Sequence, residues 1–340
     1  MENNQENQIN TVVEQPITPE QNLPKNKDSL SVGISKGWFI FNAILVVSII
    51  VMTFIIYAEI HKPVKTEISL DNPPTKNKKI FNSIRLEAKS AYVFDILKNE
   101  ILYKKNESIR LPLASLTKIM TALTAVELFP KDSKITIKKE FLEEEGDTGL
   151  LLDESWKLKD LLDFSLAVSS NDGAKAIASV AGAFDLKTDD YNLGRKDFVK
   201  KMNERAKELG LTQTYFINES GLDEDNVSGG YGSAEDVSKL IQYILKTRPE
   251  LLEATTYKTI NIKSLNKTHV AKNTNEYVGV IPGLLASKTG YTSLAGGNLI
   301  VAFDQSIGRP IIVIVLGSSE KGRFTDVQNL VKASSDYIKE

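Results

Sequence analysis

The stretch from Gly37 to Ala58 constrains the chain most, because it contains no charged residue. As a helix, at ~1.5 Å per residue, it would reach about 33 Å and cross the hydrocarbon core of a bilayer. Trp38 and Tyr57 lie near its ends, as interfacial aromatic residues do. A buried core helix and a cleaved signal peptide are the alternatives, but the length of the stretch and the long polar lead before it favour an uncleaved anchor. We therefore predict a transmembrane anchor over residues 37–58.

The segments around this stretch differ from the rest of the chain in composition. Residues 1–36 are rich in Asn, Gln, Glu and Pro, which predicts a disordered N-terminal tail. Residues 59–83 contain several prolines and lysines and are predicted to form a stalk. From residue 84 the pattern becomes globular, so residues 84–340 are expected to form one domain.

The residue counts exclude several kinds of chemistry. The 340 residues include no Cys and two His, which excludes disulfides and thiol nucleophiles and argues against a metal site. A net charge of −2 shows no excess of basic residues of the kind that nucleic-acid-binding proteins carry. His269 lies in a polar stretch without a G-x-S-x-G motif, so we expect a surface or loop residue and not a triad member. We expect no cofactor, no metal and no nucleic-acid partner.

Leu111–Phe129 predicts an apolar helix with a serine and a lysine at its start. Pro112 and the absence of any further Pro or Gly place the beginning of the helix near Ala114. Ser115 and Lys118, three residues apart, would then share a face. The helix N-terminus favours a developing anion, and a partly desolvated amine has a lowered pKa. The pair is a candidate nucleophile and base.

A Ser-x-x-Lys spacing alone is a weak signal. It also occurs at Ser264–Lys267 and Ser318–Lys321, although neither heads a long apolar helix. The alternative is that Ser115 is an ordinary helix-start residue and Lys118 a solvated side chain.

The remaining pattern places strands at both ends of the globular region and helices in its middle. Residues 91–105 predict a hairpin, residues 286–317 predict antiparallel strands, and residues 323–338 predict a terminal amphipathic helix. We therefore expect an antiparallel sheet completed by both ends of the domain, with an inserted helical lobe.

Two further clusters fall in fitting elements. Ser169, Ser170 and Asn171 interrupt a helical pattern, and Lys288, Thr289 and Gly290 lie on a late strand. Singly, the first is an ordinary turn and the second an edge-strand lysine. In this order after Ser115 and Lys118, the clusters together indicate an active site.

These motifs, S-x-x-K, S-x-N and K-T-G, resemble those of the penicillin-binding proteins and serine β-lactamases. Within that superfamily the chain is similar to the D-alanyl-D-alanine carboxypeptidases. The resemblance covers residues 84–338, through the blocks ASLTKIMTAL, DLLDFSLAVSSNDGAKAIA and SKTGYTSLAGGNLIVAF. It implies the α/β (α+β) fold of that family, an antiparallel sheet flanked by helices with an all-helical lobe.

The resemblance also implies roles. Ser115 would attack the carbonyl between two D-alanines, with neutral Lys118 taking its proton and Ser169 relaying a proton to the leaving amine. The residues expected to bind the substrate are Asn171 at its amide, Lys288 and Thr289 at its terminal carboxylate, Gly290 beside the strand, and Tyr291, whose backbone N–H would share the oxyanion hole with that of Ser115.

The same resemblance implies the partners and the location. Peptidoglycan stem peptide is the expected substrate and β-lactams are the expected covalent inhibitors. That substrate lies outside the cytoplasmic membrane, so we place the domain outside, although lysines flanking residues 37–58 favour a cytoplasmic domain by the positive-inside count.

The chain also departs from the expected pattern. Ser170 and Gly173 replace residues of the expected S-G-N-D-A-A block, and residues 143–154 are more acidic than expected. The competing functions are a β-lactamase, for which no E-x-x-L-N pattern is found, a D,D-endopeptidase or transpeptidase using the same site, and a membrane-tethered scaffold that binds peptidoglycan without cutting it.

Overall fold

The structure is a computed structural model that describes residues 45, 48–53 and 79–339. The chain divides into two units, Met1–Asp71 and Asn72–Glu340. In the first unit, residues 45 and 48–53 are helical. The predicted tail, most of the predicted anchor over residues 37–58 and most of the predicted stalk lie outside the described residues. Among the residues that are described, no helix has both the length and the apolar character needed to cross a membrane.

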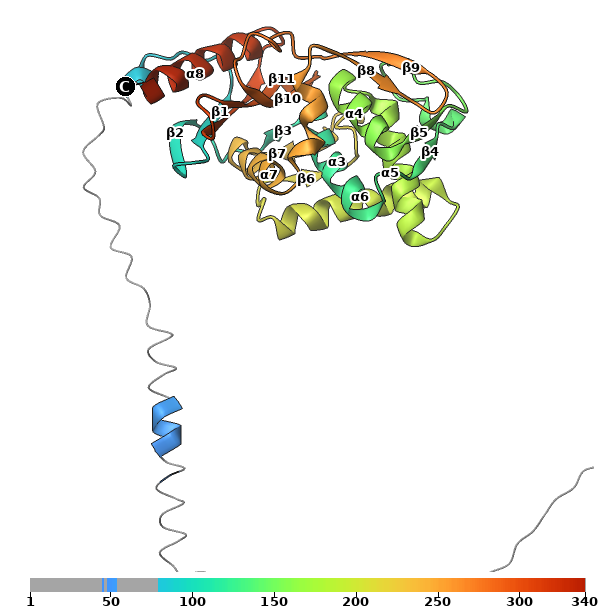
Figure 1. Cartoon of the computed structure of the whole chain (residues 1–340), viewed down its shortest axis with the longest axis horizontal. Coiled ribbons are helices and arrows are strands. Elements are labelled where there is room, and N and C mark those ends of the chain that lie inside the picture. Colours follow the sequence, from blue (N-terminus) through green and yellow to red (C-terminus); the bar gives the residue numbers. More distant parts are fainter. Residues whose placement is uncertain (1–44, 46–47, 54–78, 340) are drawn as a thin grey trace, which may run out of the picture. The chain divides into compact units, whose positions relative to one another are not determined.

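A five-stranded antiparallel sheet lies in the second unit (Figure 1). Ser90 pairs with Leu316, so an early strand and a late strand lie side by side in its middle. The strand order is β10-β11-β12-β1-β2, with β1 at Ser90–Asp95, β2 at Glu100–Lys105, β10 at Leu284–Thr292, β11 at Gly296–Asp304 and β12 at Pro310–Ser318.

The sheet separates two apolar cores. Side chains of β1 alternate between them, as successive residues of a strand face opposite sides. Ala91 and Val93 join the core beneath helix α8 (Gly322–Lys339), which packs on β11 and β12. Tyr92 and Phe94 join the other core, where helix α7 (Ala234–Thr247) packs on β1 and β12.

The helical lobe is built around one buried helix. Helix α3 packs against its three neighbours, and its residues from 117 to 125 are all buried. A Cβ on Gly182 would overlap the carbonyl of Gly194, so glycine at this position allows helices α5 and α6 to approach closely. The lobe comprises α3 (Thr117–Leu128), α4 (Leu158–Val168), α5 (Asn171–Leu186) and α6 (Tyr191–Glu208).

Short elements complete the domain. They are helix α2 (Lys79–Asn82), a sheet of β3 (Leu111–Pro112), β7 (Gly230–Gly232) and β6 (Tyr215–Phe216), the hairpin of β4 (Lys134–Thr136) and β5 (Ser155–Lys157), the hairpin of β8 (Thr259–Lys263) and β9 (Thr268–Lys272), and the 3₁₀ turns η2 (Ala114–Leu116), η3 (Lys139–Phe141), η4 (Pro249–Leu251) and η5 (Glu253–Thr256).

The predicted fold class is confirmed. The sheet is completed by both ends of the domain, the helices of the lobe lie between its first two and last three strands, and the terminal helix is α8.

The helix predicted to begin near Ala114 was placed too early, because residues 114–116 form the 3₁₀ turn η2 and the α-helix begins at Thr117. The prediction of a surface position for His269 was wrong: it lies on β9 with 7% exposure.

Candidate active site

Ser115 lies in a turn, residues 113–116, between strand β3 and helix α3. Ala114 has φ of +48°, which is uncommon for a residue with a side chain and stores strain. The surroundings hold this turn: Leu113 N donates to Gly230 O at 2.8 Å, and a Cβ on Gly221 would overlap the carbonyl of Ala114. The turn leaves Ser115 partly exposed at the beginning of a buried helix.

Lys118 is directed at three oxygens. Its Nζ lies 2.9 Å from Ser115 Oγ, 2.7 Å from Asn171 Oδ1 and 2.7 Å from the carbonyl oxygen of Ser220. Lys118 is only 2% exposed, so these three oxygens take the place of the water that would otherwise hydrate its amine. The Ser-x-x-Lys spacing thus places the amine within hydrogen-bond distance of the serine hydroxyl, as a nucleophile and its base require.

The environment of Lys118 favours the neutral amine. Burial lowers the pKa of Lys118 to about 7, and the carboxylates of Glu219 and Glu144 oppose this effect. A substantial fraction of the amine is therefore neutral near physiological pH and available to accept a proton.

The turn between α4 and α5 holds the S-x-N motif. Ser169 ends α4 in the left-handed region, and Ser170 caps α5 by accepting a hydrogen bond from Gly173 N at 3.0 Å. Asn171 begins α5, accepts from Lys118 and donates from Nδ2 to Glu145 O at 2.6 Å. This motif therefore supplies one of the three oxygens that contact the candidate base.

An acidic segment, residues 143–147, borders the S-x-N motif. Its backbone is attached there, because Glu144 N donates to Asp172 Oδ1 at 3.1 Å. The side chains of Glu143, Glu145 and Asp147 are exposed. The acidity noted in the sequence therefore lies beside Asn171.

The K-T-G motif brings strand β10 to the same place. Lys288 Nζ donates to Ser169 Oγ at 2.8 Å and to Thr289 O at 2.9 Å. The hydroxyl oxygens of Thr289 and Thr274 are 2.5 Å apart. A Cβ on Gly290 would lie 2.9 Å from Leu113 O and 3.2 Å from Ser115 N, so glycine allows the strand to lie against the turn that carries Ser115.

Tyr291 follows on the same strand, and its side chain is 50% exposed. The closeness of the preceding Gly290 to Ser115 N places the backbones of the two expected oxyanion-hole residues next to each other. The structure thus gathers every sequence-predicted site residue around Ser115, on η2, α3, the α4–α5 turn and β10.

Arg323 was not found by the sequence reasoning. Arg323 lies near the beginning of helix α8, and its Nη1 donates a hydrogen bond to Gly290 O of the K-T-G motif at 2.8 Å. Burial, Lys118 and Arg323 together lower the pKa of Lys288 well below its ordinary value. No local motif marks Arg323, since it is simply an early residue of the last helix.

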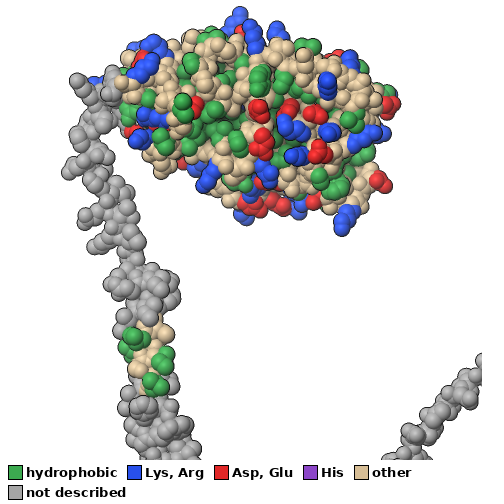
Figure 2. Space-filling view, in the orientation of Figure 1, with side chains coloured by type: hydrophobic (Ala, Val, Ile, Leu, Met, Phe, Trp, Pro, Cys, Tyr) green, Lys and Arg blue, Asp and Glu red, His purple; other side chains and the backbone are tan. Residues whose placement is uncertain are grey.

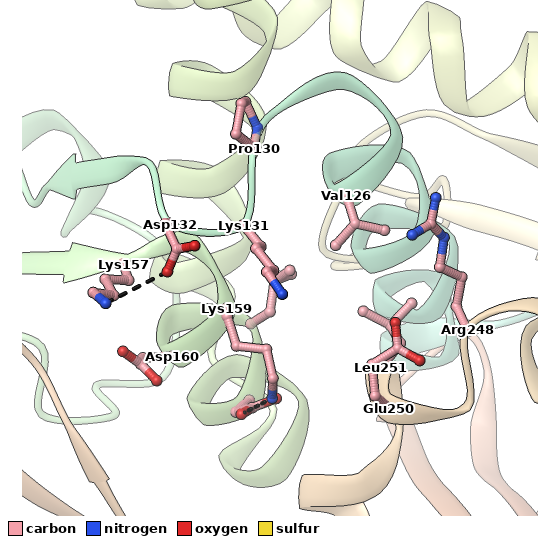
Figure 3. A pocket seen from close by; sticks show the side chains of 12 residues that line it. Val126, Pro130, Lys131, Asp132, Lys157, Lys159, Asp160, Arg248, Glu250 and Leu251 are labelled. Atoms are coloured by element: carbon pink, nitrogen blue, oxygen red, sulfur yellow. Dashed lines mark hydrogen bonds and ion pairs between the residues drawn. The ribbon is translucent and has the colours of Figure 1, made fainter.

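Figure 3 shows a cleft of about 640 Å³. It lies at the ends of helices α3 and α4 that are remote from the candidate active site. Its lining includes Val126 of α3 and Asp163 of α4, whereas Lys118 and Ser169 lie at the other ends of these helices. Acidic and basic side chains line it in pairs, such as Lys159 with Asp163.

Basic and acidic side chains are interspersed over the face of the domain seen in Figure 2.

His269 is buried in a structural cluster away from the motifs. Its Nε2 is 2.6 Å from Glu154 Oε1, which also accepts a hydrogen bond from Ser264 at 2.6 Å. The rings of Trp156 and Phe164 lie against it. Its contacts join the β8–β9 hairpin to the β4–β5 hairpin.

The fold and this site together define a class. A sheet and a helical lobe with S-x-x-K, S-x-N and K-T-G at their junction are the features of a low-molecular-mass penicillin-binding protein. Residues 76–320 match the Peptidase_S11 family, D-alanyl-D-alanine carboxypeptidase. The chain belongs to this family of serine-type carboxypeptidases.

Curated relatives carry two kinds of name. D-alanyl-D-alanine carboxypeptidase DacF of Bacillus subtilis is 32% identical over 259 residues, which are 74% of this chain and 63% of DacF. D-alanyl-D-alanine endopeptidase of Haemophilus influenzae is 31% identical over 217 residues, which are 63% of this chain and 69% of that protein. The match thus spans less than two thirds of DacF.

Solved structures share the fold. Penicillin-binding protein D2 of Listeria monocytogenes in its ampicillin-bound form has a TM-score of 0.63 and 30% identity, over 74% of this chain and 98% of that one. A mutant of the Streptomyces K15 DD-transpeptidase has a TM-score of 0.67 over 76% of this chain and 100% of that one, and at 24% identity it supports the fold alone.

Proposed function

We propose that the protein is a D-alanyl-D-alanine carboxypeptidase that removes the terminal D-alanine of peptidoglycan stem peptides through an acyl-enzyme on Ser115. The observation that carries the proposal is the 2.9 Å contact between Ser115 Oγ and the Nζ of a buried Lys118 whose pKa is about 7. No histidine or cysteine takes part.

Acylation begins at this contact. Neutral Lys118 accepts the Ser115 proton while Oγ bonds to the carbonyl carbon of the penultimate D-alanine. The negative charge on the carbonyl oxygen is stabilised by the backbone N–H groups of Ser115 and Tyr291. The C–N bond then breaks as the proton held by Lys118 passes through Ser169, whose hydroxyl is hydrogen-bonded to Lys288, to the nitrogen of the leaving D-alanine, which leaves Lys118 neutral again.

Deacylation reverses the proton movements. Water replaces the departed amine, gives a proton to Lys118 and attacks the ester carbonyl, and Ser115 Oγ leaves with the returned proton. The products are free D-alanine and the shortened peptide.

Substrate recognition is assigned to the positive end of the site. Lys288 donates to two neutral oxygens, Ser169 Oγ and Thr289 O, and its buried charge is further disfavoured by Lys118 and Arg323. A terminal carboxylate would supply the negative charge that Lys288 and Arg323 favour. Thr289 would donate a hydrogen bond to the same carboxylate.

The location is part of the proposal. We assign residues 37–58 as a membrane anchor from their charge-free sequence, with the catalytic domain on the extracytoplasmic side where peptidoglycan lies.

Release of D-alanine tests the activity. The protein should release D-alanine from a stem pentapeptide, and Ser115→Ala should release none. The endopeptidase names of some relatives make cross-linked stem peptides the second substrate to test. Cleavage of the cross-link without D-alanine release would establish the endopeptidase instead, rapid turnover of penicillin would establish a β-lactamase, and peptidoglycan binding without either cleavage would establish a scaffold.

A further inference from the structure

A buried ion pair lies directly behind the candidate base. Glu219 has 0% exposure, and Arg195 Nε lies 3.0 and 2.9 Å from its two carboxylate oxygens. Arg195 belongs to helix α6, and Glu219 lies in the loop between β6 and β7. A buried charge pair has a high desolvation cost and is weak support for stability by itself, so its position requires another explanation.

Glu219 is attached to the catalytic helix α3. Its carbonyl accepts a hydrogen bond from Thr121 Oγ1 at 2.6 Å. The next carbonyl along the chain, that of Ser220, accepts from Lys118 Nζ at 2.7 Å. Displacement of Glu219 would therefore displace one of the three oxygens that orient the amine.

A second set of contacts links Arg195 to Lys118 through the acidic segment. Its Nη2 lies 3.9 Å from Glu144 Oε1, in the acidic segment. The neighbouring carbonyl of Glu145 accepts from Asn171 Nδ2 at 2.6 Å, and Asn171 Oδ1 accepts from Lys118 at 2.7 Å. The contacts thus close a ring that begins and ends at Lys118.

We propose that Arg195 and Glu219 form a positioning pair that holds the Ser220 carbonyl and the acidic segment against Lys118 and sets the charge around that amine. The inference rests on the proposed function, because it assigns the pair a role in activating Ser115. Neither residue touches the reacting atoms.

The two charges have opposite effects on Lys118. Glu219 and Glu144 favour its protonated form, and Arg195 neutralises part of both carboxylates. Lys118 in turn disfavours the charged form of Lys288 on β10 by charge repulsion, which helps to lower the pKa of Lys288. Three charged groups interact with Lys118 directly: Glu144 from the acidic segment, Glu219 from the β6–β7 loop and Lys288 from β10. A fourth, Arg195 from α6, acts through its ion pairs with Glu144 and Glu219.

The pH dependence of acylation separates the two effects. Acylation by a penicillin requires neutral Lys118, so its rate falls as the pH drops below the Lys118 pKa. We call this falling part of the pH–rate profile the acid limb. Glu219→Gln removes an anion, and we expect its acid limb to move to lower pH by about half a unit or more, a roughly threefold rate change on the limb. Arg195→Gln leaves Glu219 unneutralised, so its limb should move to higher pH by a similar amount.

The double variant and two controls complete the test. Arg195→Gln with Glu219→Gln should return the limb close to that of the wild type, because both charges are gone. Arg195→Lys should keep most of the wild-type limb. Arg205→Gln, on the same helix and paired with Glu127 and Glu208, should change the melting temperature without moving the limb.

A second measurement covers the case in which Arg195→Gln does not fold. A cleft of about 510 Å³ borders both Arg195 and Glu219 and gives a small cation access to the pair. Millimolar guanidinium should restore acylation at low pH to Arg195→Ala, produced with guanidinium present, and should leave Arg205→Gln unchanged.

The outcomes are distinct. Opposite limb shifts in the two single variants, with recovery in the double variant, support the positioning pair. Equal losses of rate with unmoved limbs, or a lack of guanidinium rescue in folded Arg195→Ala, overturn it while wild-type acylation leaves the proposed function intact. A wild type that forms no penicilloyl adduct overturns the proposed function first.

Discussion

Lys288 Nζ lies 2.8 Å from Ser169 Oγ, which joins strand β10 of the sheet to the α4–α5 turn of the helical lobe. Ser115 lies near both, because its backbone N–H is close to Gly290 of β10 and its hydroxyl contacts Lys118. The candidate active site is therefore built from both parts of the domain, and its geometry depends on how the sheet and the lobe are packed together.

The acid limb of acylation should report Lys118. Because burial lowers its pKa to about 7, the amine is mostly protonated below that pH and cannot accept the Ser115 proton. The rate of penicillin acylation should therefore rise with pH through about 7 and fall roughly tenfold for each pH unit below it. Stopped-flow or quenched-flow measurements of adduct formation from about pH 5 to about pH 8 provide the profile.

The control for this prediction is Lys118→Arg. A guanidinium remains charged throughout that range, so the variant should show no titrating limb and only residual acylation. A wild-type rate that does not change across this range would contradict the assignment of Lys118 as the base.

Gly290→Ala should damage the site more than the fold. The added methyl would lie 2.9 Å from Leu113 O and 3.2 Å from Ser115 N, which displaces the turn or the strand. We expect a loss of acylation of at least about tenfold and a destabilisation of about 1–3 kcal/mol. Acylation kinetics and thermal unfolding measure the two effects.

Gly279→Ala is the matched control, because its added methyl meets open space although its φ is +93°. It should lower stability by about 1 kcal/mol through backbone strain and leave acylation unchanged. Full acylation by Gly290→Ala would show that the close approach of β10 is dispensable.

Gly173 and Ser165 should be energetically coupled. A Cβ on Gly173 would overlap Ser165 Oγ and lie 3.2 Å from Ser165 Cβ. Gly173→Ala should therefore cost about 1–3 kcal/mol, and adding Ser165→Ala should recover part of that loss. Denaturant unfolding of both single variants and the double variant measures the coupling, and strictly additive effects would contradict the proposed contact.

The motif residues and the order of elements were accessible from sequence because they rest on local patterns. Ser115 and Lys118 are three residues apart on one helical face, and the alternation around β1 and β2 marks a hairpin. The assembly of S-x-x-K, S-x-N and K-T-G into one site followed from resemblance, since no local pattern relates residues as distant as Ser169 and Lys288.

Other features depend on tertiary packing and were missed for that reason. The polar neighbours of His269 favoured a surface position, but its partner Glu154 comes from a distant hairpin. Arg323 reaches the K-T-G strand only because α8 packs on that side of the sheet. The strained φ of Ala114 is imposed by neighbouring backbone and has no sequence signal.

Mass spectrometry after exposure to a penicillin tests the central claim most directly. The account predicts that the intact wild-type protein gains one penicilloyl group and that peptide mapping places it on Ser115. Ser115→Ala should gain none, whereas Ser169→Ala, which retains Ser115 and Lys118, should still gain the adduct more slowly. An unmodified wild type, or the same adduct on Ser115→Ala, would contradict the assignment of Ser115 as the nucleophile.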